Sequence, residues 1–282
     1  MTGLRMKSKW LKTNVLLQSH ELQQFIPATK PWSPSCFQMM LDQYAMIYLK
    51  PDIGTFGKGV IRAEKKPHGV YTFQLGTRLY TFSSLEQMID RLQRIIGTRR
   101  YIVQQGIHLL SHMQRRFDIR VMIQKNPANE WEATGIIGRL GNPRKIVTNY
   151  HSGGTPLPFE LLMQSYLSLD EMPQYQASLN QLGIEVARQL EQQLPSLKEI
   201  GVDVAIDLSL QPWILEVNTR PDPYIFRKLN DKAVFRKIYC YCVGYGRIKK
   251  KRKRRMKLRR AGKIRKNRGQ RFKKQPSGKP NG

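Results

Sequence analysis

Two segments say more about this chain than any other: Trp213-Ile214-Leu215-Glu216-Val217-Asn218-Thr219-Arg220-Pro221, and Val202-Asp203-Val204-Ala205-Ile206-Asp207 just before it. Apolar and polar residues alternate in both segments, as they do along half-buried strands. Residues 209–212 between them have the composition of a turn. The two segments therefore predict a β-hairpin.

The register of this hairpin brings three oxygen-bearing side chains together. A turn centred between Ser209 and Leu210 places Asp203 opposite Glu216 and points Asn218 to the same face. Mg²⁺ usually takes one or two carboxylates and completes its shell with phosphate oxygens and water. The hairpin thus predicts a magnesium site, and the alternative is a solvated polar face of an amphipathic hairpin.

The opposite face of the hairpin is apolar, and we expect it to lie in a core. Its predicted members are Val202, Val204, Ile206 and Leu208 on the first strand, and Trp213, Leu215 and Val217 on the second.

Positive charge is concentrated at the C-terminal end. The chain has 282 residues, with 49 Lys and Arg against 20 Asp and Glu, and its formal net charge of +29 predicts an anionic partner. Residues 247–282 hold 19 of the Lys and Arg and no acid. Because this tail lacks apolar periodicity and repels itself, we expect it to be disordered when free and to bind a polyanion such as a nucleic acid, an acidic polypeptide or an anionic membrane.

The rest of the composition indicates an ordinary cytoplasmic protein. The three cysteines, Cys36, Cys240 and Cys242, are too few for a disulfide framework or a zinc site of their own. No apolar run approaches the roughly 18 residues of a membrane span, so no transmembrane segment is expected. Residues 1–20 contain no acid, and a helix leading into the fold is favoured over a transit peptide.

A glycine-rich loop follows a short apolar strand at residues 45–49. Its sequence is Gly54-Thr55-Phe56-Gly57-Lys58-Gly59, four residues after Lys50. Glycines let backbone N–H groups approach an anion closely, and the lysines add positive charge, so the loop favours phosphate binding. The spacing fits neither a P-loop nor a dinucleotide-binding motif, and a plain hairpin tip is the alternative.

The remaining pattern predicts a mixed, mostly antiparallel α+β fold. Apolar residues at helical spacing predict a helix over 85–96, started by a capping box at residues 83–86, and another around 179–194. Strands are expected at 71–74, 78–82, 101–105, 118–124 and 131–139.

Two arginines on these strands suit the recognition of phosphate or carboxylate. Arg120 shares a strand face with Asp118, and Arg139 ends the next strand. The alternative is a surface pair between Asp118 and Arg120, which would contribute little. Asn149 lies on a loop before two glycines and could present its amide to a ligand, whereas the five histidines lack metal-ligand spacing and are expected to be structural or solvated.

Seven segments occur in an order that resembles the ATP-grasp fold, and within it most nearly the YheC/YheD family, the endospore coat-associated proteins of spore-forming bacteria. The segments are Lys50-Pro51 with the glycine-rich loop, Gln104 to Ile107, Asp118 to Val121, Arg139, Val147 to Asn149 with Gly153-Gly154, Gly201 to Asp203, and Leu215 to Pro221. The likeness covers about residues 7 to 240.

The resemblance implies two α+β subdomains with largely antiparallel sheets that grip ATP. The implied divisions are a helical lead-in and first strand over 1–49, a small subdomain over 50–105, a larger subdomain with the metal site over 106–246, and the basic tail over 247–282. Such proteins usually have a further N-terminal domain, so this chain is expected to have a truncated one.

The resemblance also implies a role for each candidate residue. Lys9, Lys50, Gly54, Thr55, Phe56, Gly57, Lys58 and Gly59 would bind the ATP phosphates, and Gln104, Gln105, Gly106 and Ile107 would lie beside adenine and ribose. Arg120 and Arg139 would stabilise the transferred phosphoryl group, Asn149 would hold the reacting substrate, and Asp203, Glu216 and Asn218 would hold Mg²⁺.

The implied reaction is ATP-dependent activation of a carboxylate to an acyl phosphate, followed by attack of an amine or similar nucleophile. Two other functions stay open. One is a non-enzymatic structural or anchoring protein of the spore that retains the fold and works through its tail, with a spore polymer among the polyanions it could bind. The other is a kinase that uses the same ATP site.

Overall fold

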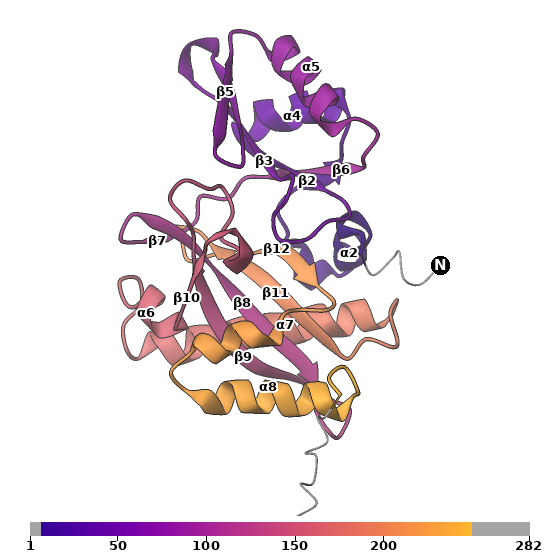
Figure 1. The fold of residues 1–282 in the computed structure, drawn as a ribbon, viewed down its shortest axis with the longest axis vertical. Coiled ribbons are helices and arrows are strands. Elements are labelled where there is room, and N and C mark those ends of the chain that lie inside the picture. Colours follow the sequence, from indigo (N-terminus) through magenta and orange to yellow (C-terminus); the bar gives the residue numbers. More distant parts are fainter. Residues whose placement is uncertain (1–6, 250–282) are drawn as a thin grey trace, which may run out of the picture. The chain divides into compact units, whose positions relative to one another are not determined.

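A computed structural model describes residues 7–249 of the chain. These residues form two antiparallel sheets, with the strand orders β1-β6-β2-β3-β4-β5 and β10-β9-β8-β11-β12, and with the short β7 paired to β8 (Figure 1). The predicted α+β class with antiparallel sheets is therefore confirmed. The predicted disorder of the tail concerns residues 250–282, which lie outside the described part of the chain.

The first sheet has helices over one face. Its elements are β1 (Thr29–Pro31), α4 (Pro34–Tyr44), β2 (Met46–Pro51), β3 (Ile61–Lys65), the 3₁₀ helix η1 (Pro67–Gly69), β4 (Tyr71–Leu75), β5 (Arg78–Phe82), α5 (Leu85–Ile96) and β6 (Tyr101–Gln105). Phe37, Phe73 and Leu92 join α4, β4 and α5 in one core. Ser84 caps α5 by accepting from the Gln87 N–H, one residue later than the predicted capping box.

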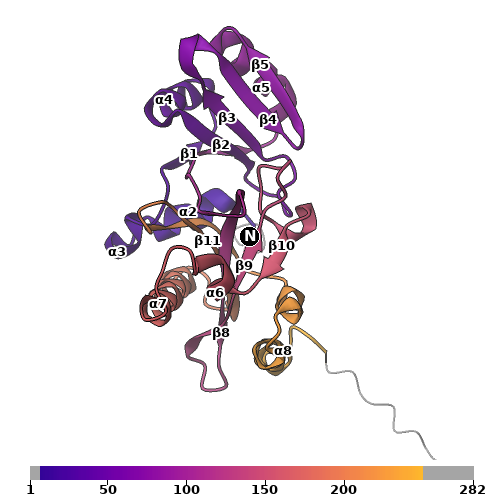
Figure 2. The ribbon, with the colours of Figure 1, turned by 90° about the vertical axis from the view of Figure 1, so that its left-hand side faces the viewer.

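The second sheet carries helices on both faces. Its elements are β7 (Ser111–His112), β8 (Arg115–Lys125), β9 (Trp131–Leu140), β10 (Thr155–Leu157), α6 (Phe159–Met163), α7 (Glu171–Glu191), β11 (Glu199–Ile206), β12 (Pro212–Asn218) and α8 (Lys232–Gly244), with the 3₁₀ helices η2 (Tyr150–Ser152) and η3 (Pro223–Lys228). Helix α7 packs on one face and α8 on the other (Figure 2).

The N-terminal segment divides between these two cores. Helices α2 (Lys9–Leu16) and α3 (His20–Gln23) contact α7, and Leu16 and Leu22 are buried in the core of the second sheet. Helix α4 instead belongs to the first sheet. Residues 7–44 thus connect the two sheets, and α2 contacts β12, which places Lys9 near the predicted metal hairpin.

The hairpin register agrees with the prediction at the predicted metal ligands and departs from it between them and the turn. Asp203 lies opposite Glu216, but Val204 lies opposite Ile214, so Leu215 is an extra residue in a β-bulge. Because a bulge reverses the alternation of faces, Ile214 is buried in the core and Leu215 lines a cavity. The predicted core positions of Trp213, Leu215 and Leu208 are therefore wrong, and Leu208 is 79 % exposed in the turn.

The folded unit extends past its predicted end at residue 246. Arg247 forms an ion pair with Glu199 of β11, and the Ile248 N–H donates to the Cys242 carbonyl at 3.1 Å. The first residue assigned to the tail is therefore part of the fold. Among residues 7–249, no helix has the length and apolar character needed to cross a membrane.

The core of the first sheet should respond to loss of a single leucine on α5. Leu92 is 0 % exposed, whereas Leu79 on β5 is 64 % exposed. Leu92→Ala should lower the free energy of unfolding by about 2–5 kcal/mol in denaturant titrations, because it leaves a cavity in a packed core. Leu79→Ala is the matched control and should change it by less than about 0.5 kcal/mol. Equal effects would contradict this core assignment.

Candidate active site

One cavity of about 530 Å³ gathers nearly all of the residues singled out in the sequence. It is lined from the first sheet by Lys50, Gln104 and Gln105, and from the second by Arg120, Arg139, Asp203, Glu216 and Asn218. Lys9, Gly54, Thr55, Phe56, Gly57, Lys58, Ile107 and Asn149 complete the predicted set that lines it. Gly59 and Gly106 do not line it: the Gly59 carbonyl accepts from the Tyr101 hydroxyl, and the Gly106 N–H donates to the Met46 carbonyl.

A buried cluster of two arginines and two aspartates forms the cavity wall on the second sheet. Arg139 lies opposite Asp118 in the β8–β9 register and donates to both of its carboxylate oxygens, at 2.8 and 2.5 Å. Arg120 lies opposite Asp203 in the β8–β11 register and donates to it. Arg139 also reaches Asp203 at 3.0 Å, which closes the cluster.

This arrangement corrects the alternative of a surface pair between Asp118 and Arg120, because both residues are buried and each pairs with a residue on another strand. Burial alone would raise the pKa of the Asp203 carboxyl, but Arg120 and Arg139 outweigh it and hold this pKa below its ordinary value. Asp203 is therefore an anion in the folded protein.

Glycine at position 201 gives this cluster its room. A Cβ atom there would lie 2.8 Å from the Pro221 Cβ and 3.0 Å from the Arg120 Cδ. Real side chains do not pack that closely, so a larger residue would displace the proline ring, the arginine or both. Gly201 thus leaves room for the Arg120 side chain beside Asp203.

The three predicted metal ligands meet at the edge of this cluster. The Asn218 amide donates to Asp203 at 3.4 Å, and Glu216 lies opposite Asp203 with Lys9 at 3.5 Å from its carboxylate. Residues 7–249 contain no cluster of three or more His, Cys, Asp or Glu side chains suited to a metal ion. The set here has two carboxylates and one amide.

Lys50 is a half-buried lysine that lines the cavity. It donates to the Gln104 amide oxygen at 2.5 Å and to the Leu215 carbonyl at 3.3 Å, the carbonyl of the bulge residue. Burial lowers the pKa of Lys50 to about 8, although Glu216 opposes the shift. The bulge therefore supplies a neutral acceptor for a lysine that has no carboxylate within ion-pair distance in the described chain.

The glycine-rich loop lies against the segment that carries Asn149. The Ser152 hydroxyl donates to the Phe56 carbonyl at 3.0 Å, and the Phe56 ring packs on His151 with 4.2 Å between ring centroids. At Gly57, φ is +69° and a Cβ would lie 3.0 Å from Val147. Glycine is required there by both the backbone conformation and the close approach.

The cavity also contains residues that sequence reasoning missed. They include Tyr48, Leu109, Ile146, Tyr150, His151, Leu215, Arg220, Asp222, Tyr224 and Arg247. Alternation along β2 could have placed Tyr48 on the same face as Lys50. The position of Leu215 could not have been predicted without knowledge of the bulge. Arg247 belongs to a basic run that the sequence analysis assigned to the tail.

Comparison with known proteins assigns the family. A family model described as YheC/D like ATP-grasp matches residues 1–248. The chain belongs to this ATP-grasp family. The endospore coat-associated protein YheD of Bacillus subtilis (strain 168) is 24 % identical over 225 residues, which cover 75 % of this chain and 49 % of YheD. YheC of the same organism is 25 % identical over 229 residues, which cover 78 % of this chain and 61 % of YheC. The chain spans about half to three fifths of these relatives.

Solved structures show the same ATP-grasp fold. The D-cycloserine synthetase DcsG has a TM-score of 0.53 and 11 % identity, with 86 % of this chain and 71 % of that chain covered. The N5-carboxyaminoimidazole synthetase from Staphylococcus aureus, complexed with ADP, also has a TM-score of 0.53, with 10 % identity, 85 % of this chain and 52 % of that chain covered. The predicted ATP-grasp fold is thus confirmed.

The pKa of Lys50 offers a direct test of the cavity floor of this ATP-grasp protein. With lysine ¹³Cε labelling, the Lys50 resonance should titrate with a midpoint near pH 8, below the ordinary 10.5, because its amine is buried. Lys50→Arg identifies the resonance by its absence. Since the amine is neutral above that midpoint, affinity for an anionic ligand should fall as pH rises past about 8. A midpoint near 10.5 would contradict the described burial.

Proposed function

We propose that this protein is a Mg·ATP-dependent carboxylate–amine ligase that acts through an acyl phosphate. The observation that carries the proposal is the single cavity in which lysines, a glycine-rich loop, paired arginines and a carboxylate–amide set converge between two sheets. Phosphoryl transfer requires positioning and cancellation of charge more than covalent help from the protein, and this cavity offers both.

The donor set fits a magnesium ion. Asp203 and Glu216 contribute carboxylates, and Asn218 contributes an amide, on one face of a paired hairpin. Asp203 accepts from Arg120, Arg139 and the Asn218 amide, but a carboxylate has about four lone-pair positions and can share the remaining one with a cation. When bound, Mg²⁺ would supply charge neutralisation at the phosphates.

Each of the other residues has a role in this proposal. Lys50 leaves Gln104 to bind the α- and β-phosphates, and Lys9 and Lys58 add charge nearby. Arg120 and Arg139 keep Asp203 ionised and oriented while contributing their own positive charge to the transferred phosphoryl group. Residues 54–58, including Gly54 and Thr55, cover the phosphates and exclude water.

The substrate side is also assigned within this proposal. Gln104, Gln105 and Ile107 line the cavity where the chain passes from β6 toward the second sheet, and they would border adenine and ribose. Asn149 would hold the reacting carboxylate beside residues 54–59.

The relatives YheC and YheD are named endospore coat-associated proteins, and we propose that this chain also acts in association with the spore.

The metal assignment predicts how ATP binding depends on Glu216. In titration calorimetry, ATP should bind more tightly with Mg²⁺ than without, and Glu216→Gln should weaken Mg·ATP binding by about tenfold or more, or about 1.4 kcal/mol. Glu185→Gln on α7, a carboxylate that does not line the cavity, is the matched control and should bind like the unaltered protein. Unchanged binding in Glu216→Gln would contradict the metal role.

For the basic segment we propose binding to a polyanion, which rests on its 19 Lys and Arg without any acid over 247–282. A chain that ends at Lys249 retains Arg247 and should keep its ATP affinity. Its salt-sensitive binding to polyglutamate should be lost. Polyglutamate binding that persists after this truncation would show that the tail is not the binding element.

A further inference from the structure

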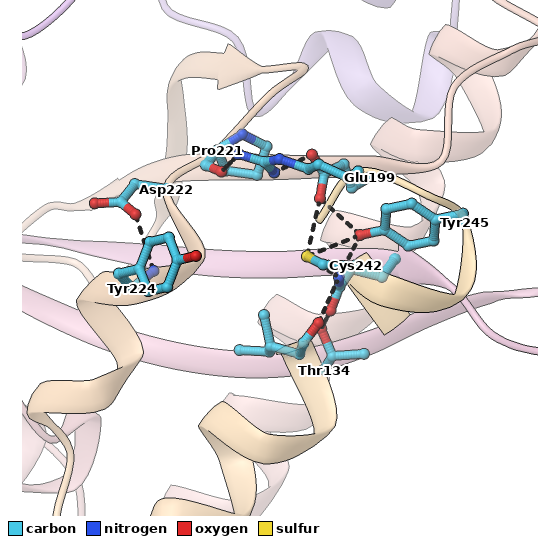
Figure 3. A network of polar contacts seen from close by, with 10 residues as sticks. Thr134, Glu199, Pro221, Asp222, Tyr224, Cys242 and Tyr245 are labelled. Atoms are coloured by element: carbon cyan, nitrogen blue, oxygen red, sulfur yellow. Dashed lines mark hydrogen bonds and ion pairs between the residues drawn. The ribbon is translucent and has the colours of Figure 1, made fainter. Parts of the chain in front are cut away.

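The C-terminal end of the folded unit reaches the wall of the cavity. Helix α8 ends at Gly244, and three residues later Arg247 lines the cavity beside Pro221. Its Nη1 pairs with Glu199, and its Nη2 donates to the Pro221 carbonyl oxygen at 2.5 Å. Figure 3 shows Glu199 and Pro221 at this junction. One guanidinium thus joins the start of β11 to the loop that follows β12.

Glu199 is a fixed anchor for this guanidinium. It is buried, and its other carboxylate oxygen accepts from the Tyr245 hydroxyl at 2.6 Å. Gln124 of β8 donates to that hydroxyl, and Thr134 of β9 donates to the Gln124 amide oxygen, each at 2.5 Å (Figure 3). Burial raises the pKa of Glu199, and the contacts of Tyr245 and Arg247 oppose the shift. The anchor is therefore tied across three strands of the second sheet.

The loop held by this anchor, residues 219–222, touches the site at several points. It follows Asn218 directly, and its Pro221 ring packs at Gly201, the glycine that leaves room for Arg120. Arg220 and Asp222 both line the cavity.

Asp222 links the same loop to residues 54–59. One Asp222 oxygen accepts from the Tyr224 N–H at 2.9 Å, and the other lies 4.0 Å from the His151 Nε2. The His151 ring packs on Phe56, as described above. Residues 219–222 therefore link Asn218, at the end of β12, to the glycine-rich loop at residues 54–59.

We propose that Arg247 is a positioning residue, which holds residues 219–222 through the Pro221 carbonyl and so fixes Asn218 and the cavity wall for Mg·ATP. This inference rests on the proposed function for its effect on binding, but its effect on the loop is independent of any activity. The sequence run that reads as the start of a basic tail thus begins with a residue of the site itself.

The test compares Arg247→Met with Tyr245→Phe in the full-length chain. Arg247→Met should speed hydrogen–deuterium exchange in peptides covering residues 216–224 by about tenfold and weaken Mg·ATP binding by a similar factor. Tyr245→Phe removes a hydrogen bond from the same network but leaves the Arg247 to Pro221 contact. It should lower Tm without either effect. Arg247→Lys should restore part of the affinity.

A second variant distinguishes the loss of loop positioning from the effect of leaving the Glu199 carboxylate unpaired. Arg247→Met leaves the Glu199 carboxylate without its cation, whereas the double variant Arg247→Met, Glu199→Gln also removes that negative charge. Both variants should show the same faster hydrogen–deuterium exchange over residues 216–224. Unchanged exchange over 216–224, or equal effects in Tyr245→Phe, would overturn the proposal. If the unaltered protein fails to bind Mg·ATP, the proposed function is wrong, and the exchange comparison still decides whether Arg247 positions the loop.

Discussion

The ion-pair cluster of Arg120, Arg139, Asp118 and Asp203 is the constraint on which the rest of the site depends. Four charged groups lie at most 7 % exposed on one face of the second sheet, and such groups are tolerated only when they are paired and hydrogen-bonded. Removing one partner from a buried pair typically costs about 3–5 kcal/mol, because the other charge is left uncompensated. The cluster therefore fixes the register of β9, β8 and β11, and with it the orientation of Asp203 toward Glu216 and Asn218.

The arginines of this cluster and Lys50 differ in the partners that hold them in the cavity. Arg120 and Arg139 are neutralised by aspartates, whereas Lys50 rests on an amide oxygen and a backbone carbonyl, which are weaker partners. Among the described residues, the charges of the two arginines are thus paired with aspartates, whereas the charge of Lys50 has no acid within ion-pair distance.

Much of this organisation could be predicted from the sequence because it follows local rules. Strand alternation and turn chemistry gave the pairing of Asp203 with Glu216, and helical spacing gave α5 and α7. The bulge at Leu215 could not be predicted, since one extra residue leaves no mark in composition yet reverses the faces of the side chains between the bulge and the turn. The partners of Asp118 and Arg247 depend on contacts between distant segments, so neither period nor charge pattern could identify them.

We expect the cavity between the two sheets to bind Mg·ATP through the hairpin and the glycine-rich loop. A crystal structure with Mg²⁺ and a non-hydrolysable ATP analogue tests it most directly. We expect a metal ion bound by Asp203, Glu216 and Asn218, the Lys50 ammonium moved from Gln104 to phosphate oxygens, and Arg139 still paired with Asp118. A nucleotide bound elsewhere, or a metal that contacts none of the three hairpin residues, would contradict it.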